Sequence, residues 1–244
     1  MRSVVITEFG GPEVLQVREG AVPIPETGQV LVRISAAGVN FIDIYQRQGG
    51  PNYGITLPFT PGMEGAGVIE ALGDGVSEYA IGDRVAWPFA LGSYSEYIAV
   101  DASKVVKIPQ SLDLPVAAGA MLQTLTAHYL TCSTYPITSG DIALVHAAAG
   151  GTGALVCQMV RERGGTVIAT TSSDEKAALI REFGVDHIIR YDQKDFASEV
   201  REITSGRGVD VVYDGVGAAT FDKSLTCLDR KSTRLNSSHV SESR

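Results

Sequence analysis

A glycine-rich turn at residues 146–153, with the sequence HAAAGGTG, is the feature that most constrains the fold of this chain. The apolar run IALVH at 142–146 leads into the turn, and an amphipathic helical pattern follows it. One face of that helix is apolar and is formed by Leu155, Val156, Met159 and Val160. A strand, a glycine turn and a helix in this order occur either at a dinucleotide site or in a tight connection between two elements. The neighbouring sequence decides between these alternatives.

The alternation of strand and helix continues toward the C-terminus. Short apolar runs typical of buried parallel strands occur at 142–146, 166–170, 187–191 and 209–214. Amphipathic helical patterns lie between them. This order predicts an α/β fold with a doubly wound parallel sheet. A complete sheet of this kind has about six strands. We therefore expect the chain to be truncated at its C-terminus and 209–214 to be an unpaired edge strand.

In this setting the glycine turn predicts a nucleotide-binding site. Ala148, Gly150 and Gly153 occupy the three positions of the G-x-G-x-x-G pattern, with alanine in place of the first glycine, and Gly151 and Thr152 lie between them. A glycine at 150 lets the backbone approach a pyrophosphate, and a glycine at 153 lets helix and strand pack closely. Free N–H groups at the helix start attract phosphate. We predict that these five residues bind the cofactor.

The end of the second predicted strand bears on the choice of cofactor. NAD sites place an acidic residue there to bind the ribose 2′-hydroxyl, whereas this strand ends in Thr171, Ser172 and Ser173. Lys176 follows within one helical turn, so hydroxyls and an ammonium can meet the 2′-phosphate of NADP; alternatively, Lys176 is a solvated helix lysine. Asp174 has the spacing of an NAD site, but it is also an ordinary first-turn acid after a serine cap. The pattern favours NADPH bound by Ser172, Ser173 and Lys176.

Residues 1–110 have a different sequence pattern from the C-terminal half. Many short β-like runs, separated by glycine and proline, predict a β-rich domain with one short helix at 40–49. The last stretch, 230–244, is polar and serine-rich without apolar periodicity, which predicts a non-native or disordered tail. The resulting domains are 1–122, 123–229 and the tail 230–244.

Composition excludes several classes of partner. The 244 residues carry a formal net charge of −8, which argues against nucleic acid or an anionic membrane as partner. The sequence has no apolar run of about 18 residues and no signal-peptide pattern, so we expect no membrane span and a cytoplasmic protein. Its three cysteines contain no CxxC pair, which argues against a disulfide framework and a zinc knuckle.

Several ordered motifs share one pattern: GGPEVL (10–15), GVNFIDIYQRQG (38–49), PGMEGAGVIEALGDGV (61–76), GDRVAW (82–87), LTAHYL (125–130) and HAAAGGTG (146–153). Through them residues 1–229 resemble the quinone oxidoreductase (zeta-crystallin-like) branch of the medium-chain dehydrogenase/reductases. The resemblance implies a GroES-like β-rich catalytic domain followed by a Rossmann domain, with the active site in the cleft between them. It also implies NADPH as hydride donor and a homodimer or higher homo-oligomer.

Zinc-dependent members of that superfamily place a cysteine in the segment matching GVNFIDIY and a histidine before the glutamate of GMEGAG. This chain has Asn40 and Met63 at those positions. A catalytic zinc needs about three protein ligands from cysteine, histidine and carboxylate, and only Glu64 remains of that set. The four histidines are scattered and are expected to be packed or surface residues. We therefore predict no metal and no alcohol dehydrogenase.

Hydride transfer to a quinone, an enone or an enal does not require a metal. A hydrogen-bond donor can stabilise the negative charge that grows on the acceptor's carbonyl oxygen. By resemblance, Asn40 and Tyr45 lie on the segment that faces the nicotinamide, and both side chains can donate. Alternatively, Tyr45 is a wedge against the cofactor ring and Asn40 is a turn residue that holds backbone.

Three further residues are candidates for cofactor contact. By resemblance, Thr126 matches a position near the nicotinamide or its ribose, and Tyr191 matches a cofactor-contacting tyrosine. The alternatives are a helix hydroxyl bonded to its own backbone and simple edge packing. Gly215 lies in the DGVG segment, 214–217, which ends the fourth predicted strand where a dinucleotide crosses the sheet.

Three functions follow from these observations. The leading hypothesis is a zinc-independent, NADPH-dependent oxidoreductase that transfers hydride to a small-molecule quinone. The second is NADPH-dependent reduction of the C=C bond of enals or enones. The third is a non-catalytic NADPH-binding protein. Because the acceptor pocket is poorly encoded in the sequence, substrate assays are needed to separate the first two.

Overall fold

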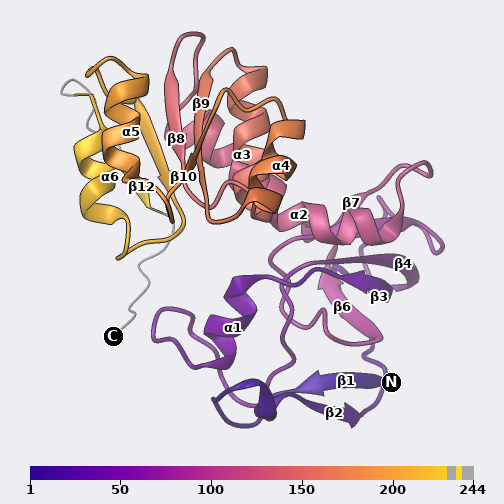
Figure 1. The fold of residues 1–244 in the computed structure, drawn as a ribbon. Helices are drawn as coiled ribbons and strands as arrows, with labels where there is room; N and C mark the ends of the chain where they lie inside the picture. The colour runs from indigo at the N-terminus through magenta and orange to yellow at the C-terminus, as the bar shows by residue number, and fades with distance from the viewer. Residues whose placement is uncertain (230–234, 238–244) are drawn as a thin grey trace. The chain divides into compact units, whose positions relative to one another are not determined.

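The computed structural model of the chain describes residues 1–229 and 235–237. The chain divides into two compact units, Met1–Leu122 and Gln123–Arg244 (Figure 1). The predicted tail at 230–244 lies outside the described residues, except for the three that form the last strand.

The first unit is β-rich, as predicted, and its strands pair antiparallel. Its larger sheet has the order β6-β3-β4-β5-β7, and β1 pairs with β2 in a smaller sheet. The strands are β1 Arg2–Val5, β2 Gln16–Glu19, β3 Gln29–Ala37, β4 Gly65–Leu72, β5 Arg84–Trp87, β6 Tyr97–Asp101 and β7 Val106–Lys107; two 3₁₀ segments lie at Pro12–Val14 and Ala102–Lys104. Alternate side chains of a strand point to opposite faces. Val30 and Val32 therefore enter one core together with Ile69, Val85 and Trp87.

Helix α1, Phe41–Arg47, lies within the span predicted from the sequence. Asn40 precedes it in an extended conformation, and its backbone N–H donates to Asp43 Oδ2 over 2.9 Å. This contact is one half of a capping box and fixes where the helix begins. Gly49 follows the helix with φ +75°, a left-handed conformation that glycine adopts without steric cost.

The second unit contains a five-stranded sheet in the order β10-β9-β8-β11-β12, with every neighbouring pair parallel. Its strands are β8 Ile142–Val145, β9 Thr166–Thr171, β10 His187–Arg190, β11 Val211–Asp214 and β12 Leu235–Ser237. The helices of the remaining chain are α2 Leu114–Tyr129, the π-helical segment Leu130–Thr134, α3 Gly151–Glu162, α4 Asp174–Glu182, α5 Phe196–Ile203 and α6 Phe221–Cys227. This strand order is that of a Rossmann sheet, as predicted.

Both faces of the second sheet are covered by helices (Figure 1). Ala143 and Val145 of β8 pack in a cluster that includes residues of α3 and α4. Leu144, between them, packs in a second cluster with residues of α5 and α6. The period of two in a strand assigns successive β8 residues to opposite layers, and this explains why the strand is apolar throughout.

The expectation that residues 209–214 would form an unpaired edge is wrong. β12 lies beside β11 in parallel, with Val212, Tyr213 and Asp214 paired to residues 235–237. The segment gave no strand signal because it is polar and serine-rich. Pairing at a sheet edge uses backbone N–H and C=O groups, which every residue except proline carries.

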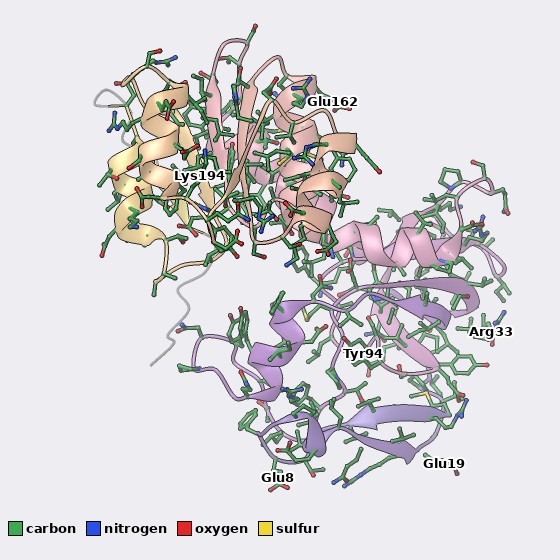
Figure 2. All side chains as sticks on the ribbon, viewed as in Figure 1. Glu8, Glu19, Arg33, Tyr94, Glu162 and Lys194 are labelled. Atoms are coloured by element: carbon green, nitrogen blue, oxygen red, sulfur yellow. The ribbon has the colours of Figure 1, made fainter. Side chains whose placement is uncertain are left out.

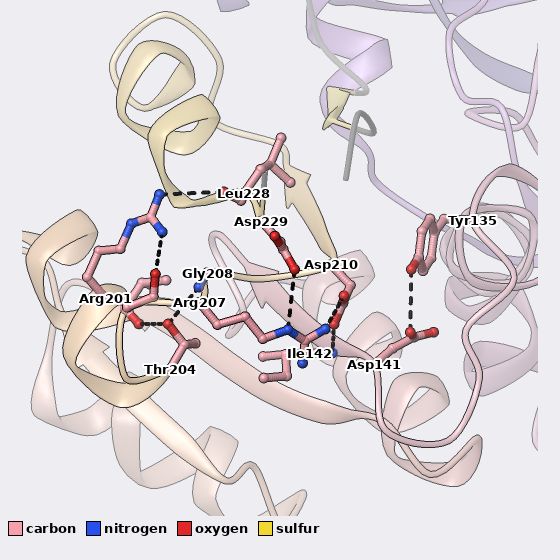
Figure 3. Close-up of polar contacts among 12 residues, drawn as sticks. Tyr135, Asp141, Ile142, Arg201, Thr204, Arg207, Gly208, Asp210, Leu228 and Asp229 are labelled. Atoms are coloured by element: carbon pink, nitrogen blue, oxygen red, sulfur yellow. Dashed lines mark hydrogen bonds and ion pairs between the residues drawn. The ribbon is translucent and has the colours of Figure 1, made fainter. Parts of the chain in front are cut away.

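Polar contacts tie together the amino ends of the parallel strands (Figure 3). Asp210, just before β11, accepts from the Ile142 N–H at the start of β8 over 2.8 Å and is ion-paired to Arg207. Arg207 also lies 3.4 Å from Asp229. The Thr204 hydroxyl accepts from the Gly208 N–H over 2.9 Å. The contacts of Asp210 with Ile142 and of Arg207 with Asp229 join segments far apart in the sequence, at the amino ends of the strands.

Candidate nucleotide and acceptor sites

The glycine turn follows strand β8 directly. β8 ends at Val145, the turn passes through Ala147 with φ +50°, and α3 begins at Gly151. Ala148 is fully buried, and its N–H donates to the Thr170 carbonyl of β9 over 3.3 Å. The turn therefore lies at the carboxyl ends of two neighbouring strands.

Gly153 allows α3 to approach the turn. A Cβ atom at this position would lie 2.5 Å from the Ala147 carbonyl oxygen and 2.9 Å from Ala148 Cα. Both are backbone atoms, so helix and turn can pack this closely only without a side chain at 153. At Gly150 the nearest atom to a Cβ would be the same Ala147 oxygen, at 3.2 Å. Packing within the turn therefore restricts position 150 much less than position 153.

The first turn of α3 presents backbone donors. Gly150 is its N-cap residue, and among the described residues this cap has no side-chain hydrogen bond. The N–H groups at a helix start lack partners within the helix and carry partial positive charge. Gly151, Thr152 and Gly153 thus offer the kind of donor set that binds phosphate.

Three hydroxyls and one ammonium gather where β9 ends. The Ser173 hydroxyl accepts from the Lys176 N–H over 3.2 Å and so caps α4. Lys176 Nζ lies 3.4 Å from the Ser172 hydroxyl, to which it donates. Thr171 is 2% exposed, and its buried hydroxyl oxygen has no hydrogen-bond partner within the described part of the chain.

Arg190 was not among the predicted site residues. It ends β10, beside Thr171 of β9. The guanidinium donates to Asp192 through Nε over 2.9 Å and through Nη2 over 2.7 Å, and it donates to Asp174 through Nη1. These contacts raise the pKa of Arg190, and the hydrogen bonds to Asp192 make the largest contribution. The only sequence signal for Arg190 was an arginine directly after the apolar pair Ile188–Ile189.

Asp214 is the centre of a buried network at the end of β11. It accepts from the N–H groups of Val216 and Gly217, over 2.9 and 3.0 Å, and from the hydroxyls of Thr220 and Ser224, over 2.8 and 3.0 Å. Burial raises the pKa of Asp214, but these hydrogen bonds outweigh burial and hold its pKa below the ordinary value of 3.8. The carboxylate is therefore charged and fixes the backbone that follows β11.

The network extends to His146 at the end of β8. Ser224 donates its one hydroxyl proton to Asp214, so its oxygen accepts from His146 Nε2, 3.0 Å away. His146 Nδ1 then accepts from the Thr170 hydroxyl over 2.9 Å. Burial lowers the pKa of His146, opposed by the charge of Asp214. The imidazole also packs edge-on against Phe196, with ring centroids 4.8 Å apart, so His146 is a packed residue, as expected.

The remaining candidates in the second unit lie near the carboxyl ends of the parallel strands or on α2. Tyr191 directly follows β10, is 49% exposed and donates its N–H to the Thr171 carbonyl over 3.2 Å. Gly215 is exposed directly after β11. Thr126 lies on α2, three residues after Gln123, whose side chain lies against Gly151.

In the first unit, Asn40 is held by a buried carboxylate. Asn40 Nδ2 donates to Glu64 Oε1 over 2.8 Å, and the Leu122 N–H donates to Glu64 Oε2 over 2.7 Å. Glu64 is fully buried. A Cβ at Gly38 would lie 2.1 Å from Glu64 Oε1, so the absence of a side chain there makes room for the carboxylate.

A second carboxylate, that of Asp43, accepts from the Asn40 backbone N–H. Tyr94 of the first unit (Figure 2) donates its hydroxyl to Asp43 Oδ2 over 2.7 Å. Burial raises the pKa of Asp43, against the hydrogen bonds from Tyr94 and Asn40, and burial also raises the pKa of Tyr94. Gln46, one turn later on α1, lies against the Met63 sulfur at 3.4 Å. Nothing in the local sequence signalled the contact with Tyr94, which is 51 positions from Asp43.

Tyr45 belongs to a row of aromatic rings. Its ring stacks on Tyr53, with centroids 5.8 Å apart, and on Phe41, at 6.5 Å. Phe41 is 71% exposed. The three rings form one stacked aromatic cluster.

Among residues 1–229 and 235–237, no three histidine, cysteine, aspartate or glutamate side chains are grouped so that they could hold a metal ion. Within the same residues, no helix is both long enough and apolar enough to cross a membrane.

Two family models match the chain. Residues 26–110 match the alcohol dehydrogenase GroES-like domain, and residues 151–235 match a model described as zinc-binding dehydrogenase. These matches fall in the antiparallel unit and in the parallel unit, respectively.

Known proteins are similar over most of the chain. A 2-haloacrylate reductase from a Burkholderia species is 44% identical over 93% of this chain and 69% of its own length. The quinone oxidoreductase of Pseudomonas aeruginosa is 42% identical over 93% of this chain and 70% of its own. The solved Escherichia coli quinone oxidoreductase, in complex with NADPH, is 37% identical with a TM-score of 0.91, covering 95% of this chain and 71% of that one. The chain belongs to the quinone oxidoreductase family of the medium-chain dehydrogenase/reductases.

Proposed function

We propose that this protein is an NADPH-dependent reductase that transfers hydride to a quinone without a catalytic metal. The observation that carries the proposal is the pairing of Asn40 with Glu64. Where zinc-dependent members of the superfamily have metal ligands, this chain has an amide, a thioether and one buried carboxylate that hydrogen-bonds to that amide. The proposal includes a cytoplasmic homodimer, which rests on the family resemblance.

The end of β9 supports NADPH over NADH. Asp174, the one acid with NAD-like spacing, is ion-paired with Arg190 through Oδ1, so part of its acceptor capacity is already used. Lys176 and the Ser172 hydroxyl are close to each other, and the Thr171 hydroxyl is buried without a partner in the described residues. Cationic and hydroxyl groups suit a 2′-phosphate. The relative from Escherichia coli was solved with NADPH.

We assign the pyrophosphate to the turn formed by Ala148, Gly150 and the start of α3 at Gly151, Thr152 and Gly153. The donors there lack a side-chain cap, and a phosphate can approach Gly150 because no side chain intervenes. Tyr191, Gly215 and Thr126 are assigned to the remainder of the cofactor. When bound, NADPH supplies the hydride.

We assign Asn40 and Tyr45 to the acceptor. As hydride reaches a quinone, negative charge grows on its carbonyl oxygen, and an amide N–H or a phenol O–H can donate to that oxygen. Phe41, Tyr45 and Tyr53 form a stacked aromatic cluster, and aromatic rings suit contact with a planar aromatic acceptor.

Reduction of a conjugated C=C bond is the second candidate function. The observation that favours it is the 44% identity to a protein named 2-haloacrylate reductase, whose substrate carries a C=C bond conjugated to a carboxylate. The same oxyanion-type stabilisation serves both reactions, because charge develops on a conjugated oxygen in each.

The purified protein is expected to oxidise NADPH in the presence of 9,10-phenanthrenequinone and to retain its rate after dialysis against a chelator. NADPH absorbance measured with the quinone, 2-chloroacrylate and an enal, each before and after chelation, tests this. A preference for chloroacrylate or the enal would favour C=C reduction instead. NADPH binding without oxidation by any of the three would indicate a binding protein, and loss of rate on chelation would contradict the metal-free mechanism.

Lys176→Ala is expected to weaken NADPH binding about tenfold and to leave NADH binding unchanged, because it removes one charge-assisted contact to the 2′-phosphate worth about 1–2 kcal/mol. Titration calorimetry with both coenzymes measures the difference. The matched control is Lys104→Ala, in a 3₁₀ segment of the first unit, which should change neither affinity. An equal loss for both coenzymes would contradict the assignment of Lys176.

A further inference from the structure

We infer that Glu64 is a positioning residue that fixes the direction of the Asn40 amide and so keeps an N–H donor available to the acceptor oxygen. The inference rests on the proposed role of Asn40. It concerns residues of the first unit alone.

Glu64 makes two contacts that require acceptors at both of its oxygens. Oε1 accepts from Asn40 Nδ2 over 2.8 Å, and Oε2 accepts from the Leu122 N–H over 2.7 Å. Both donors are neutral amides, and the carboxylate is fully buried. A buried acceptor with two fixed donors is held in place from both sides.

This geometry allows only one orientation of the Asn40 side chain. If the amide were flipped, its oxygen would face Glu64 Oε1, and two acceptors would lie within hydrogen-bond distance without a proton between them. Nδ2 therefore stays on the Glu64 side and uses one of its two protons there. The second proton of the same nitrogen remains to be donated elsewhere, in a direction that the amide plane determines.

The surroundings keep Glu64 at this position. Gly38 leaves no space for even a methyl group, since a Cβ there would lie 2.5 Å from the Glu64 carboxyl carbon as well as 2.1 Å from Oε1. The Asn40 backbone is fixed independently by its N–H contact to Asp43. Both ends of the Asn40–Glu64 hydrogen bond are thus anchored, as a donor aimed at a reacting atom requires.

Exchanging the amide of Asn40 with the carboxylate of Glu64 distinguishes two roles of their hydrogen bond. It either orients a donor toward the acceptor or only stabilises the fold. In Asn40→Asp/Glu64→Gln, the glutamine Nε2 can donate to the aspartate, and its Oε1 can still accept from the Leu122 N–H. The hydrogen bond, the net charge and every buried partner are kept, but residue 40 now carries acceptors and a negative charge. Glu64→Gln alone cannot satisfy both Leu122 and the wild-type orientation of the Asn40 amide, because one of its two terminal atoms is a donor.

The experiment measures the unfolding midpoint, the NADPH dissociation constant and kcat with 9,10-phenanthrenequinone for the wild type, Asn40→Ala, Glu64→Gln, Asn40→Ala/Glu64→Gln and the exchanged variant. We expect Glu64→Gln to lower both midpoint and kcat. The exchanged variant should recover the midpoint and keep NADPH affinity, while kcat falls about 100-fold or more, the scale for losing one oxyanion donor. In the Asn40→Ala background, Glu64→Gln should lower kcat no further.

Each other outcome has a distinct meaning. If the exchanged variant regains both midpoint and kcat, the bond is structural and the inference fails. It also fails if Glu64→Gln lowers kcat equally with and without Asn40, or if the exchange does not restore the midpoint. If Asn40→Ala alone keeps full kcat, the proposed role of Asn40 fails instead, and the inference falls with it. The matched control is Glu70→Gln, on strand β4 shortly after Glu64 and exposed beside Arg33, which should leave kcat and NADPH affinity unchanged.

Discussion

Gly153→Ala is expected to reduce NADPH affinity by about 100-fold or more and to lower the free energy of unfolding by about 1–3 kcal/mol. The added Cβ would lie 2.5 Å from the Ala147 carbonyl oxygen, a backbone atom that cannot rotate away. Relief of this overlap has to move α3 relative to the turn. The phosphate donors at the helix start then lose their common direction, and shifts of about 1 Å are costly in such sites.

Gly150→Ala distinguishes packing from ligand binding at the same turn. Its Cβ would meet only the Ala147 oxygen, at 3.2 Å, so the free energy of unfolding should change little while NADPH affinity still falls. Gly119→Ala is the control, because Gly119 lies in α2 with open space around its Cβ position. Chemical denaturation and fluorescence titration of NADPH provide both quantities. If Gly153→Ala binds NADPH like the wild type, the turn does not hold the pyrophosphate.

Asp214→Ala is expected to lower the free energy of unfolding by about 2–5 kcal/mol, because several donors lose their acceptor and each unsatisfied buried group costs about 1–3 kcal/mol. The change removes the acceptor of the Gly217 N–H and of the Ser224 hydroxyl, which leaves both donors unsatisfied. Urea denaturation at neutral pH measures the loss. Asp222→Ala, an exposed acid on α6, should cost less than about 1 kcal/mol.

The same network predicts how this loss depends on pH. Asp214 has a folded-state pKa below its unfolded value of 3.8, so its contribution is present above that value and disappears as the pH falls through the folded pKa. Asp214→Ala should therefore lose most stability near neutral pH and approach the wild type in strong acid. A difference from the wild type that stays constant from pH 7 to pH 2 would contradict the assignment of a charged Asp214.

The sequence predicted those features that depend on local pattern. The alternation of apolar runs and amphipathic helices identified the parallel sheet, and the glycines at 150 and 153 identified a strand–turn–helix unit that the structure contains. A serine cap at Ser172 or Ser173 could be predicted, because a capping side chain accepts from an N–H two or three residues later in the chain. The structure places the cap at Ser173.

Features that depend on distant pairing could not be predicted in the same way. Asn40 and Glu64 are 24 positions apart, and Asp214 meets His146 only through Ser224. Arg190 lies 16 positions from Asp174. β12 was missed for a different reason, because edge pairing depends on backbone groups rather than on side-chain type. In each case the register of a sheet or the packing of a helix determines the contact.

The polar contacts at the amino ends of the parallel strands have a consequence for how such a protein can diversify. Asp210 links the starts of β8 and β11, while Arg190 ends β10 and the glycine turn, Lys176 and Gly215 follow the opposite ends of the strands. Loops at the carboxyl ends can therefore exchange residues and alter ligand preference while the contacts that hold the sheet remain intact. Directed evolution of coenzyme or acceptor preference therefore has its candidate positions among the carboxyl-end loop residues, apart from Gly153 and Asp214, whose packing and hydrogen bonds hold the turn and the backbone after β11.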